Sequence, residues 1–185
     1  TVFFPFFGQI DFGPFYYPLM VLVILFVSNA VNLTDGIDGL AGSVTFIVCL
    51  AVLAMAGLLQ LDGMGLYAGA LAGGLLGFLI YNFYPAKVFM GDTGSMFLGG
   101  SVLALGFGIN LPVLIAAFGI IYVIEALSVV LQVISFQTTG KRIFKMSPIH
   151  HHFEMCGWSE KKIVGVFSLV TLLGGIISVV AVFNI

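Results

Sequence analysis

The sequence predicts an all-α, polytopic integral membrane protein, a bundle of helices that cross a lipid bilayer. Of its 185 residues, 61% are hydrophobic and only 8% are charged, whereas about 25% of the residues of a soluble domain are charged. The apolar residues form continuous runs rather than alternating patterns, which favours helices over strands. Six Lys/Arg and eight Asp/Glu cannot form the basic face of a nucleic-acid-binding protein. We therefore expect a membrane protein with no nucleic-acid partner.

Six apolar stretches are long enough, or nearly so, to cross a hydrocarbon core of about 30 Å, which takes about 20 helical residues. They form a single transmembrane domain, residues 1–185, with spans at 16–31, 40–59, 66–84, 93–109, 111–136 and 163–183. The fourth is short, and the fifth is long enough to tilt or kink. The small residues Gly69, Gly73, Gly74 and Gly77 of the third span predict close packing against another helix.

The basic residues predict the orientation of the bundle. With six spans, residues 32–39, 85–92 and 137–162 lie on one side of the membrane, and residues 1–15, 61–65 and Asn110 lie on the other. All the basic residues fall on the first side: Lys87, Lys141, Arg142, Lys145, Lys161 and Lys162. Because cytoplasmic loops carry the excess of Lys and Arg, the first side is expected to be cytoplasmic.

Two polar motifs on that side indicate a phosphate or cation site. The first, NLTDGIDG, places Asn32, Asp35 and Asp38 directly after a span, among glycines that allow a ligand to approach the backbone closely. The second, FMGDTGS, places Asp92 where the next span begins. A helix N-terminus suits phosphate, and a carboxylate there suits Mg²⁺. The alternative is structural, because Asn, Thr and Asp are also ordinary helix-capping residues.

A third motif, PIHHHFE, lies in the longest polar loop and contains His150, His151 and His152. Consecutive side chains point apart on most backbones, so hydrogen bonding to phosphate oxygens fits better than a shared metal. The alternative is an ordinary interfacial loop. Within the fifth span, Glu125 is expected to face the bundle interior, where it is either neutral and hydrogen-bonded or part of a polar path. Gln132 lies two turns further on, near the same stripe.

NLTDGIDGLAG, FMGDTGS and PIHHHFE, in this order, resemble the bacterial phospho-N-acetylmuramoyl-pentapeptide transferase family. That family belongs to the polyprenyl-phosphate N-acetylhexosamine-1-phosphate transferase superfamily, and the unbroken HHH selects this branch. The resemblance implies transfer of phospho-MurNAc-pentapeptide from its UDP conjugate to undecaprenyl phosphate, which forms lipid I and releases UMP. It also implies Mg²⁺ dependence, a homodimer, ten spans in the family, and an active site on the cytoplasmic face of the bacterial inner membrane.

The resemblance also implies roles for individual residues. Asp92 matches the Mg²⁺ ligand, which holds the ion against the pyrophosphate. The matches to residues that line the nucleotide-sugar site are Asn32, Asp35 and Asp38, with Asn82 and Phe89 at the uridine and the Phe89 ring stacked on uracil. The remaining matches are Gln132 in the same cleft and a catalytic loop of His150, His151 and His152 that closes over the substrate.

One family motif has no counterpart here. The family carries an Asp-Asp pair on an earlier span, and no such dipeptide occurs in these 185 residues. Six predicted spans instead of ten suggest that this is the C-terminal portion of a longer enzyme. We therefore expect the isolated chain to be inactive without the missing half.

Three other functions remain open from the sequence. A sibling transferase would use UDP-GlcNAc with the same chemistry. An ion channel or transporter would place Asp92, Glu125 and the histidines along an ion path, although the polar motifs gather on one side. A purely structural membrane subunit would not need three dense polar motifs.

Overall fold

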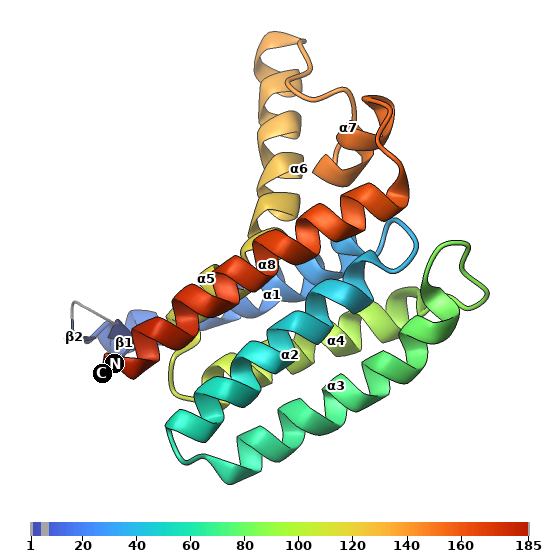
Figure 1. Ribbon diagram of the computed structural model, residues 1–185. Helices are drawn as coiled ribbons and strands as arrows, with labels where there is room; N and C mark the ends of the chain where they lie inside the picture. The colour runs from blue at the N-terminus through green and yellow to red at the C-terminus, as the bar shows by residue number, and fades with distance from the viewer. Residues whose placement is uncertain (1, 5–7, 185) are drawn as a thin grey trace.

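The computed structural model describes residues 2–4 and 8–184 and is almost entirely helical within them (Figure 1). The long helices are α1 (Tyr16–Thr34), α2 (Leu40–Leu58), α3 (Asp62–Asn82), α4 (Gly91–Gly108), α6 (Ile120–Thr139) and α8 (Glu160–Phe183). The short elements are 3-10 helices η1 (Gly13–Phe15) and η2 (Pro112–Leu114), helices α5 (Ile115–Phe118) and α7 (Ile149–Met155), and strands β1 (Val2–Phe4) and β2 (Gly8–Ile10). The two strands pair antiparallel, outside the apolar runs, where no strand was predicted.

In the part of the chain that the structure describes, five helical segments are long and apolar enough to cross a membrane: Gly13–Thr34, Leu40–Leu58, Asp62–Asn82, Ile120–Thr139 and Glu160–Phe183. The predicted span at 93–109 is present as α4, which has 18 residues but is not among these five. Its polar first turn, GDTGS, and its further glycines lower its hydropathy. The polytopic all-α fold is therefore confirmed, and a sixth crossing by α4 stays a prediction.

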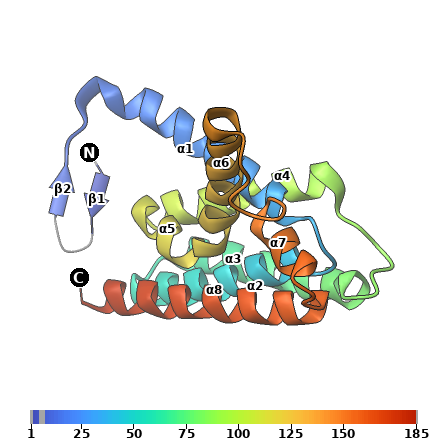
Figure 2. The ribbon, with the colours of Figure 1, turned by 90° about the horizontal axis from the view of Figure 1, so that it is seen from above.

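The bounds of the span predicted at 111–136 are wrong, but the kink that its length allowed is present. The segment is divided into η2, α5 and α6, and α6 continues to Thr139. The backbone leaves helical geometry at Gly119, where an added Cβ would lie 2.6 Å from the Ile115 carbonyl oxygen. A hydropathy plot does not detect such a break, because every residue around it is apolar. As a result, α6 rises steeply away from the other long helices, as both views show (Figure 2).

The prediction that the α3 glycines pack closely against another helix is also wrong within the described chain. An added Cβ at Gly69, Gly73, Gly74 or Gly77 would meet no atom within 4 Å. The close helix approaches involve other glycines, because they depend on which faces meet. At Gly99 of α4, an added Cβ would lie 2.8 Å from the Ser28 Cα of α1.

The buried core is shared by most of the helices and includes Tyr122 of α6, Phe118 of α5, and Leu40 and Met55 of α2. Many large apolar side chains instead point outward, as Leu66 does with 77% of its surface exposed. Such an exterior is expected of helices that face hydrocarbon. It agrees with a multi-pass membrane protein.

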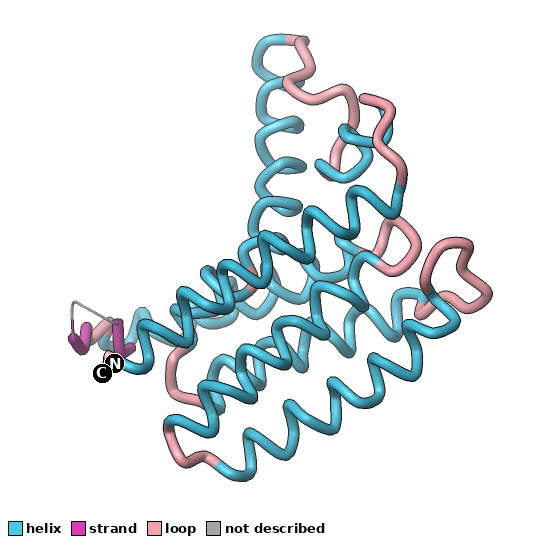
Figure 3. Tube along the Cα trace, in the orientation of Figure 1, coloured by secondary structure: helices cyan, strands magenta, loops and turns pink. Residues whose placement is uncertain are grey.

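The connections that carry the three motifs gather at one end of the molecule. The α1–α2 turn, the α3–α4 loop and the segment around α7 lie at this end, which we call the loop end (Figure 3). The β-hairpin, the α2–α3 turn and both termini lie at the other end, which we call the hairpin end. All the basic residues belong to segments of the loop end, as the alternating-loop argument predicts.

Candidate functional site

The first contact between two of the motifs joins the end of α1 to the start of α4. The Asn32 side-chain amide donates hydrogen bonds to Asp92 Oδ1 at 3.2 Å and to Ser95 Oγ at 2.8 Å. Asp92 is the second residue of α4 and is exposed, whereas Ser95 is fully buried. No side-chain capping hydrogen bond begins α4, so the capping alternative does not account for Asp92. Its carboxylate remains available near the positive end of the helix dipole.

Asp35 follows the last residue of α1 and is electrostatically coupled to Asp92. Burial of the Asp35 carboxyl, and then the negative charge of Asp92, raise the pKa of Asp35 from 3.8 to about 6. A carboxyl group whose ionisation is disfavoured by burial and by a neighbouring carboxylate is a natural place for a cation. The structure thus brings Asn32 and Asp35 close to Asp92, although Asn32 and Asp92 are 60 residues apart in the chain.

Asp38 lies in the same turn but has different partners. Its carboxylate Oδ2 accepts a hydrogen bond from the Ala86 backbone N–H at 2.8 Å, and its own N–H donates to Glu160 Oε2 at 3.2 Å. Asp35 and Asp38 are three residues apart but share no helical face, because α1 ends at Thr34 and α2 begins at Leu40. In this structure Asp38 therefore ties the α1–α2 turn to the α3–α4 loop and to α8.

Asn82, the last residue of α3, is 3% exposed and fully hydrogen-bonded. Its Oδ1 accepts from the Gly39 N–H at 3.2 Å, and its Nδ2 donates to the Val88 carbonyl at 2.8 Å. Gly39 has φ +79°, a conformation that favours glycine. These bonds fix the loop that presents Phe89, whose side chain is 72% exposed. Phe89 thus presents an exposed aromatic ring, and Asn82 holds the neighbouring residue Val88 in place through its backbone carbonyl.

His150 is the residue through which the PIHHHFE motif contacts the NLTDGIDG motif. Its imidazole is completely buried, and Nδ1 lies 3.0 Å from Glu125 Oε1 of α6. On the opposite edge of the ring, an added Cβ at Gly36 would lie only 2.2 Å from Nε2. Gly36 has no positive φ, so the glycine is needed here for space rather than for backbone conformation. The first turn of α7, which contains His150, therefore packs directly against the NLTDGIDG turn.

The other two histidines have separate partners. His151 Nδ1 is hydrogen-bonded to Glu154 one turn along α7, and both side chains are partly exposed. His152 Nδ1 accepts from the Lys145 backbone N–H at 3.1 Å. Three neighbouring rings with three different partners agree with the expectation that they do not share one metal.

Gln132 lies on the buried face of α6 and is 8% exposed. Its Oε1 accepts from the N–H groups of Ile143 and Phe144, and its Nε2 donates to the Phe144 carbonyl. Gln132 thus holds the segment after α6 against that helix. Among the described residues, no hydrogen bond joins it to Asn32 or Asp92, so its predicted place in the substrate cleft stays a prediction.

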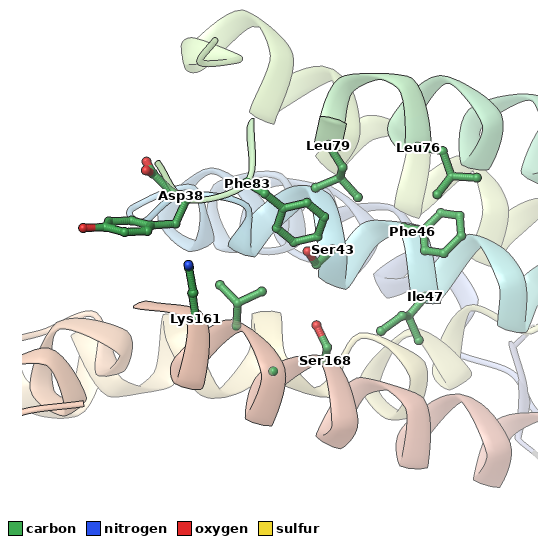
Figure 4. Close-up of a pocket in the computed structure, with 12 residues that line it drawn as sticks. Asp38, Ser43, Phe46, Ile47, Leu76, Leu79, Phe83, Lys161 and Ser168 are labelled. Atoms are coloured by element: carbon green, nitrogen blue, oxygen red, sulfur yellow. The ribbon is translucent and has the colours of Figure 1, made fainter. Parts of the chain in front are cut away.

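An apolar groove of about 570 Å³ runs between α2, α3 and α8 (Figure 4). Asp38 and Lys161 lie at one end of it, and Phe46, Ile47 and Leu76 lie at the other. The Lys161 ammonium also lies 5.5 Å from the centre of the Tyr84 ring. The groove thus combines a charged mouth at the loop end with hydrocarbon walls.

The geometry at the loop end suits an anionic ligand held with a divalent cation. In the part of the chain that the structure describes, no group of three or more His, Cys, Asp or Glu is placed to hold a metal alone. Mg²⁺ is usually bound by one or two carboxylates together with substrate phosphates and water. Asp92, with Asp35 beside it, fits that donor set.

Sequence reasoning missed three residues of this site. Ser95 and Glu160 each contact a motif residue, but each also reads as an ordinary residue of a helix start. Gly36 was noted only as a flexible glycine, and its contact with His150 depends on a fold that brings residue 36 to residue 150. No local pattern encodes these contacts; Gly36 and Ser95 lie within the NLTDGIDG and FMGDTGS motifs, which could direct attention to them, but Glu160 lies outside both.

Fold and site together define a multi-pass helical membrane protein whose loop end is polar and carries groups that suit phosphate binding. The model of glycosyl transferase family 4 matches residues 1–110. The chain therefore belongs to that family.

Curated relatives sharpen the comparison. A Clostridium botulinum (strain Eklund 17B / Type B) protein named phospho-N-acetylmuramoyl-pentapeptide-transferase is 55% identical over 175 residues, which cover 94% of this chain and 54% of that protein. Proteins of the same name from Clostridium perfringens (strain 13 / Type A) and Caldanaerobacter subterraneus subsp. tengcongensis are 55% and 53% identical, over 90% and 94% of this chain and 52% and 55% of their own lengths. The chain spans about half the length of the curated relatives it matches.

Proposed function

We propose that this polypeptide forms the nucleotide-sugar and metal half of an enzyme that transfers phospho-MurNAc-pentapeptide from UDP-MurNAc-pentapeptide to undecaprenyl phosphate. The products are lipid I and UMP. The observation that carries the proposal is the meeting of the three motifs: Asn32 contacts Asp92, and Gly36 packs against His150. The name shared by the relatives supports the same assignment.

The proposed reaction is dominated by charge repulsion. A lipid phosphate, already anionic, attacks the β-phosphorus of the nucleotide sugar, a bond to UMP breaks, and UMP leaves with the negative charge. Fixed hydrogen-bond donors and positive charge lower such a barrier because they are in place before the charge develops. Asn32, the start of α4 and the three histidines supply donors at the loop end, and Phe89 supplies a ring on which a uracil can stack.

Asp92 is proposed to hold the Mg²⁺, with Asp35 beside it, and the bound ion would neutralise pyrophosphate charge. The raised pKa of Asp35, caused by burial and then by the charge of Asp92, supports this placement, because a cation nearby would favour the ionised form of Asp35. The acceptor phosphate would reach the site from the bilayer, and the nucleotide sugar from the side that carries all the basic residues, proposed to be the cytoplasm.

The test is UMP release by a chimeric polypeptide in which this chain is joined to the half of the Clostridium botulinum relative that it does not match. The half is needed because the chain spans about half of that relative. We expect Mg²⁺-dependent UMP release that requires both UDP-MurNAc-pentapeptide and undecaprenyl phosphate, and none from the isolated chain. Release from UDP-GlcNAc instead would assign the sibling activity, and ion flux without UMP release would assign a transporter.

The proposed homodimer has a separate test, which is the mass of the chimera in lipid nanodiscs. A single mass of two copies supports the dimer. A mass of one copy under conditions that give full UMP release would remove the dimer from the proposal and leave the transferase assignment in place.

A further inference from the structure

The buried pair formed by Glu125 and His150 contains two unpaired polar atoms. Glu125 Oε2 and His150 Nε2 are both buried and have no hydrogen-bond partner among the described residues, while Glu125 Oε1 and His150 Nδ1 lie 3.0 Å apart. Leaving a buried polar atom unpaired is unfavourable. Such an atom calls for an explanation, and a catalytic role is one of them.

The contact with Glu125 links the proton position on the His150 ring to the state of the carboxyl group. The proposal takes Glu125 as a carboxylate, which only accepts hydrogen bonds, and Nδ1 of His150 is then the protonated nitrogen of the pair. In the neutral ring, the lone pair then lies on Nε2. That atom faces Gly36 of the NLTDGIDG turn, next to Asp35.

We propose that Glu125 is a positioning residue for His150: its buried carboxylate holds the imidazole with Nδ1 protonated and with Nε2 turned to the Asp35–Gly36 turn. The inference rests on the proposed function, since the turn is part of the proposed phosphate site. Nε2, which is buried against Gly36 in the described chain, is there the atom proposed to meet substrate: once protonated, it donates to a phosphate oxygen. Glu125 is fully buried and contacts the ring through Oε1, so it acts through His150 and not on the substrate itself.

The packing around the ring supports this assignment. An added Cβ at Gly36 would lie 2.2 Å from Nε2 and 2.7 Å from Cε1 of His150, so only a glycine leaves this edge of the ring open to the turn. The neighbouring pair, His151 and Glu154, has similar chemistry but is partly exposed and lies within one helix. His151 can therefore exchange its partner for water, whereas His150 is held from a different helix, 25 residues away.

The experiment compares Glu125→Gln and Glu125→Leu in the chimera with the unchanged protein. A glutamine amide can donate to Nδ1 and turn the ring to the wrong tautomer, and leucine leaves Nδ1 without a partner. We expect kcat for UMP release to fall on the order of 10²–10⁴-fold in both variants, with KM for the nucleotide sugar changed less than about threefold. A fall in kcat below about threefold in Glu125→Gln would overturn the proposal.

The control for loss of a buried hydrogen bond is Thr45→Val. Thr45 Oγ1 of α2 lies 2.7 Å from the Tyr122 hydroxyl of α6, one turn before Glu125, and both groups are buried. This variant should lower the thermal midpoint while kcat stays within about twofold of the unchanged protein. If Thr45→Val lowers kcat as much as Glu125→Gln does, Glu125 acts through the stability of α6 only, and the proposal is overturned.

Nitrogen-15 NMR of the isolated chain, labelled at histidine, tests the same point without activity. His150 is identified by the signal that disappears in His150→Gln, and it should show a protonated Nδ1 and an unprotonated Nε2. Glu125→Leu should change that signal, whereas Glu154→Gln should change only the signal of His151. A protonated Nε2 with a bare Nδ1 in the unchanged chain contradicts the positioning role even if UMP is released; the expected NMR result without any UMP release contradicts the proposed function alone.

Discussion

The two ends of the bundle are closed in different ways. At the hairpin end, the turns are closed by backbone hydrogen bonds between near neighbours, such as Leu61 N–H to the Ala56 carbonyl and Leu111 N–H to the Gly106 carbonyl. At the loop end, side chains connect segments that lie far apart in the chain, as Asn32 does with Asp92 and Asp38 does with Ala86. The first arrangement only reverses the chain. The second places separate motifs in contact, which is what a binding site requires.

Among substitutions that test this difference between the two ends, the largest loss of activity is expected at Asp92, at the loop end. Asp92→Asn in the chimera should lower kcat on the order of 10³-fold or more, because the proposed metal ligand is lost. The thermal midpoint should change little, since the side chain is exposed. The matched control is Asp62→Asn, because Asp62 is also an exposed acid in the first turn of a helix but lies at the hairpin end. Activity of Asp92→Asn that equals that of Asp62→Asn at any Mg²⁺ concentration would remove Asp92 from the metal site.

The second prediction concerns the space between the first and third motifs. Gly36→Ala places a methyl group against the buried imidazole of His150, so the free energy of unfolding should fall by about 1–3 kcal/mol and kcat should fall with it. At the hairpin end, an added Cβ at Gly57 of α2 meets nothing within 4 Å. Gly57→Ala should therefore be neutral or stabilising by up to about 1 kcal/mol. Chemical denaturation of both variants measures the contrast, and equal stabilities would show that residues 36 and 150 do not touch.

The third prediction is that Phe89 binds the base of the nucleotide. Phe89→Ala should weaken the binding of UMP by about 1–3 kcal/mol, the usual value of one base–aromatic stacking contact. Phe183→Ala removes a ring of similar exposure at the hairpin end and should leave UMP affinity unchanged. Titration calorimetry gives both affinities. If the two variants bind UMP equally well, the base lies elsewhere.

The smallest expected effect is the pH dependence of stability at Asp35. Because the pKa of about 6 in the folded chain lies above the ordinary 3.8, the folded state holds this proton more tightly than the unfolded state. The contribution to stability is therefore complete below pH about 4 and is lost as the pH rises through about 6. Asp35→Asn should thus be more stable than the unchanged chain at pH 7.5, by on the order of 1 kcal/mol after allowance for solvent screening at a partly exposed group.

Thermal unfolding of both forms at pH 4 and pH 7.5, without divalent cations, measures this effect. The advantage of Asp35→Asn should shrink toward pH 4, where Asp35 is protonated in the folded chain and about half protonated in the unfolded chain. A variant that is less stable than the unchanged chain at pH 7.5 would show that Asp35 is not strained by burial and by Asp92.

Much of the fold can be predicted from the sequence, because a membrane-spanning helix is indicated by a local feature, the length of an apolar run. The ends of α2 and α8 agree closely with the spans predicted at 40–59 and 163–183. The length of the run at 111–136 allowed for a kink, but its position at Gly119 was not predicted, because it depends on the Ile115 carbonyl and on backbone geometry rather than on hydropathy. The packing of the α3 glycines was predicted wrongly for the described chain, because small residues allow a close approach but do not determine the partner.

The candidate site was predictable as a set of motifs but not as a set of contacts. Asp92, Asn32 and His150 were all selected from the sequence, and the structure places them at one end. Their partners Ser95 and Glu125 could not be assigned, because each contact joins residues that lie 25 or more positions apart. Such contacts exist only after the helices have packed.

The most direct test of the meeting of the three motifs is paramagnetic broadening by Mn²⁺ in place of Mg²⁺, measured by NMR on the isolated chain. An ion bound at Asp92 should broaden the signals of Asn32, Gly36 and His150 together, and should leave Asn110 at the hairpin end sharp. Broadening at Asp92 that spares both Gly36 and His150, or that reaches Asn110 equally, would contradict a single site built from the three motifs.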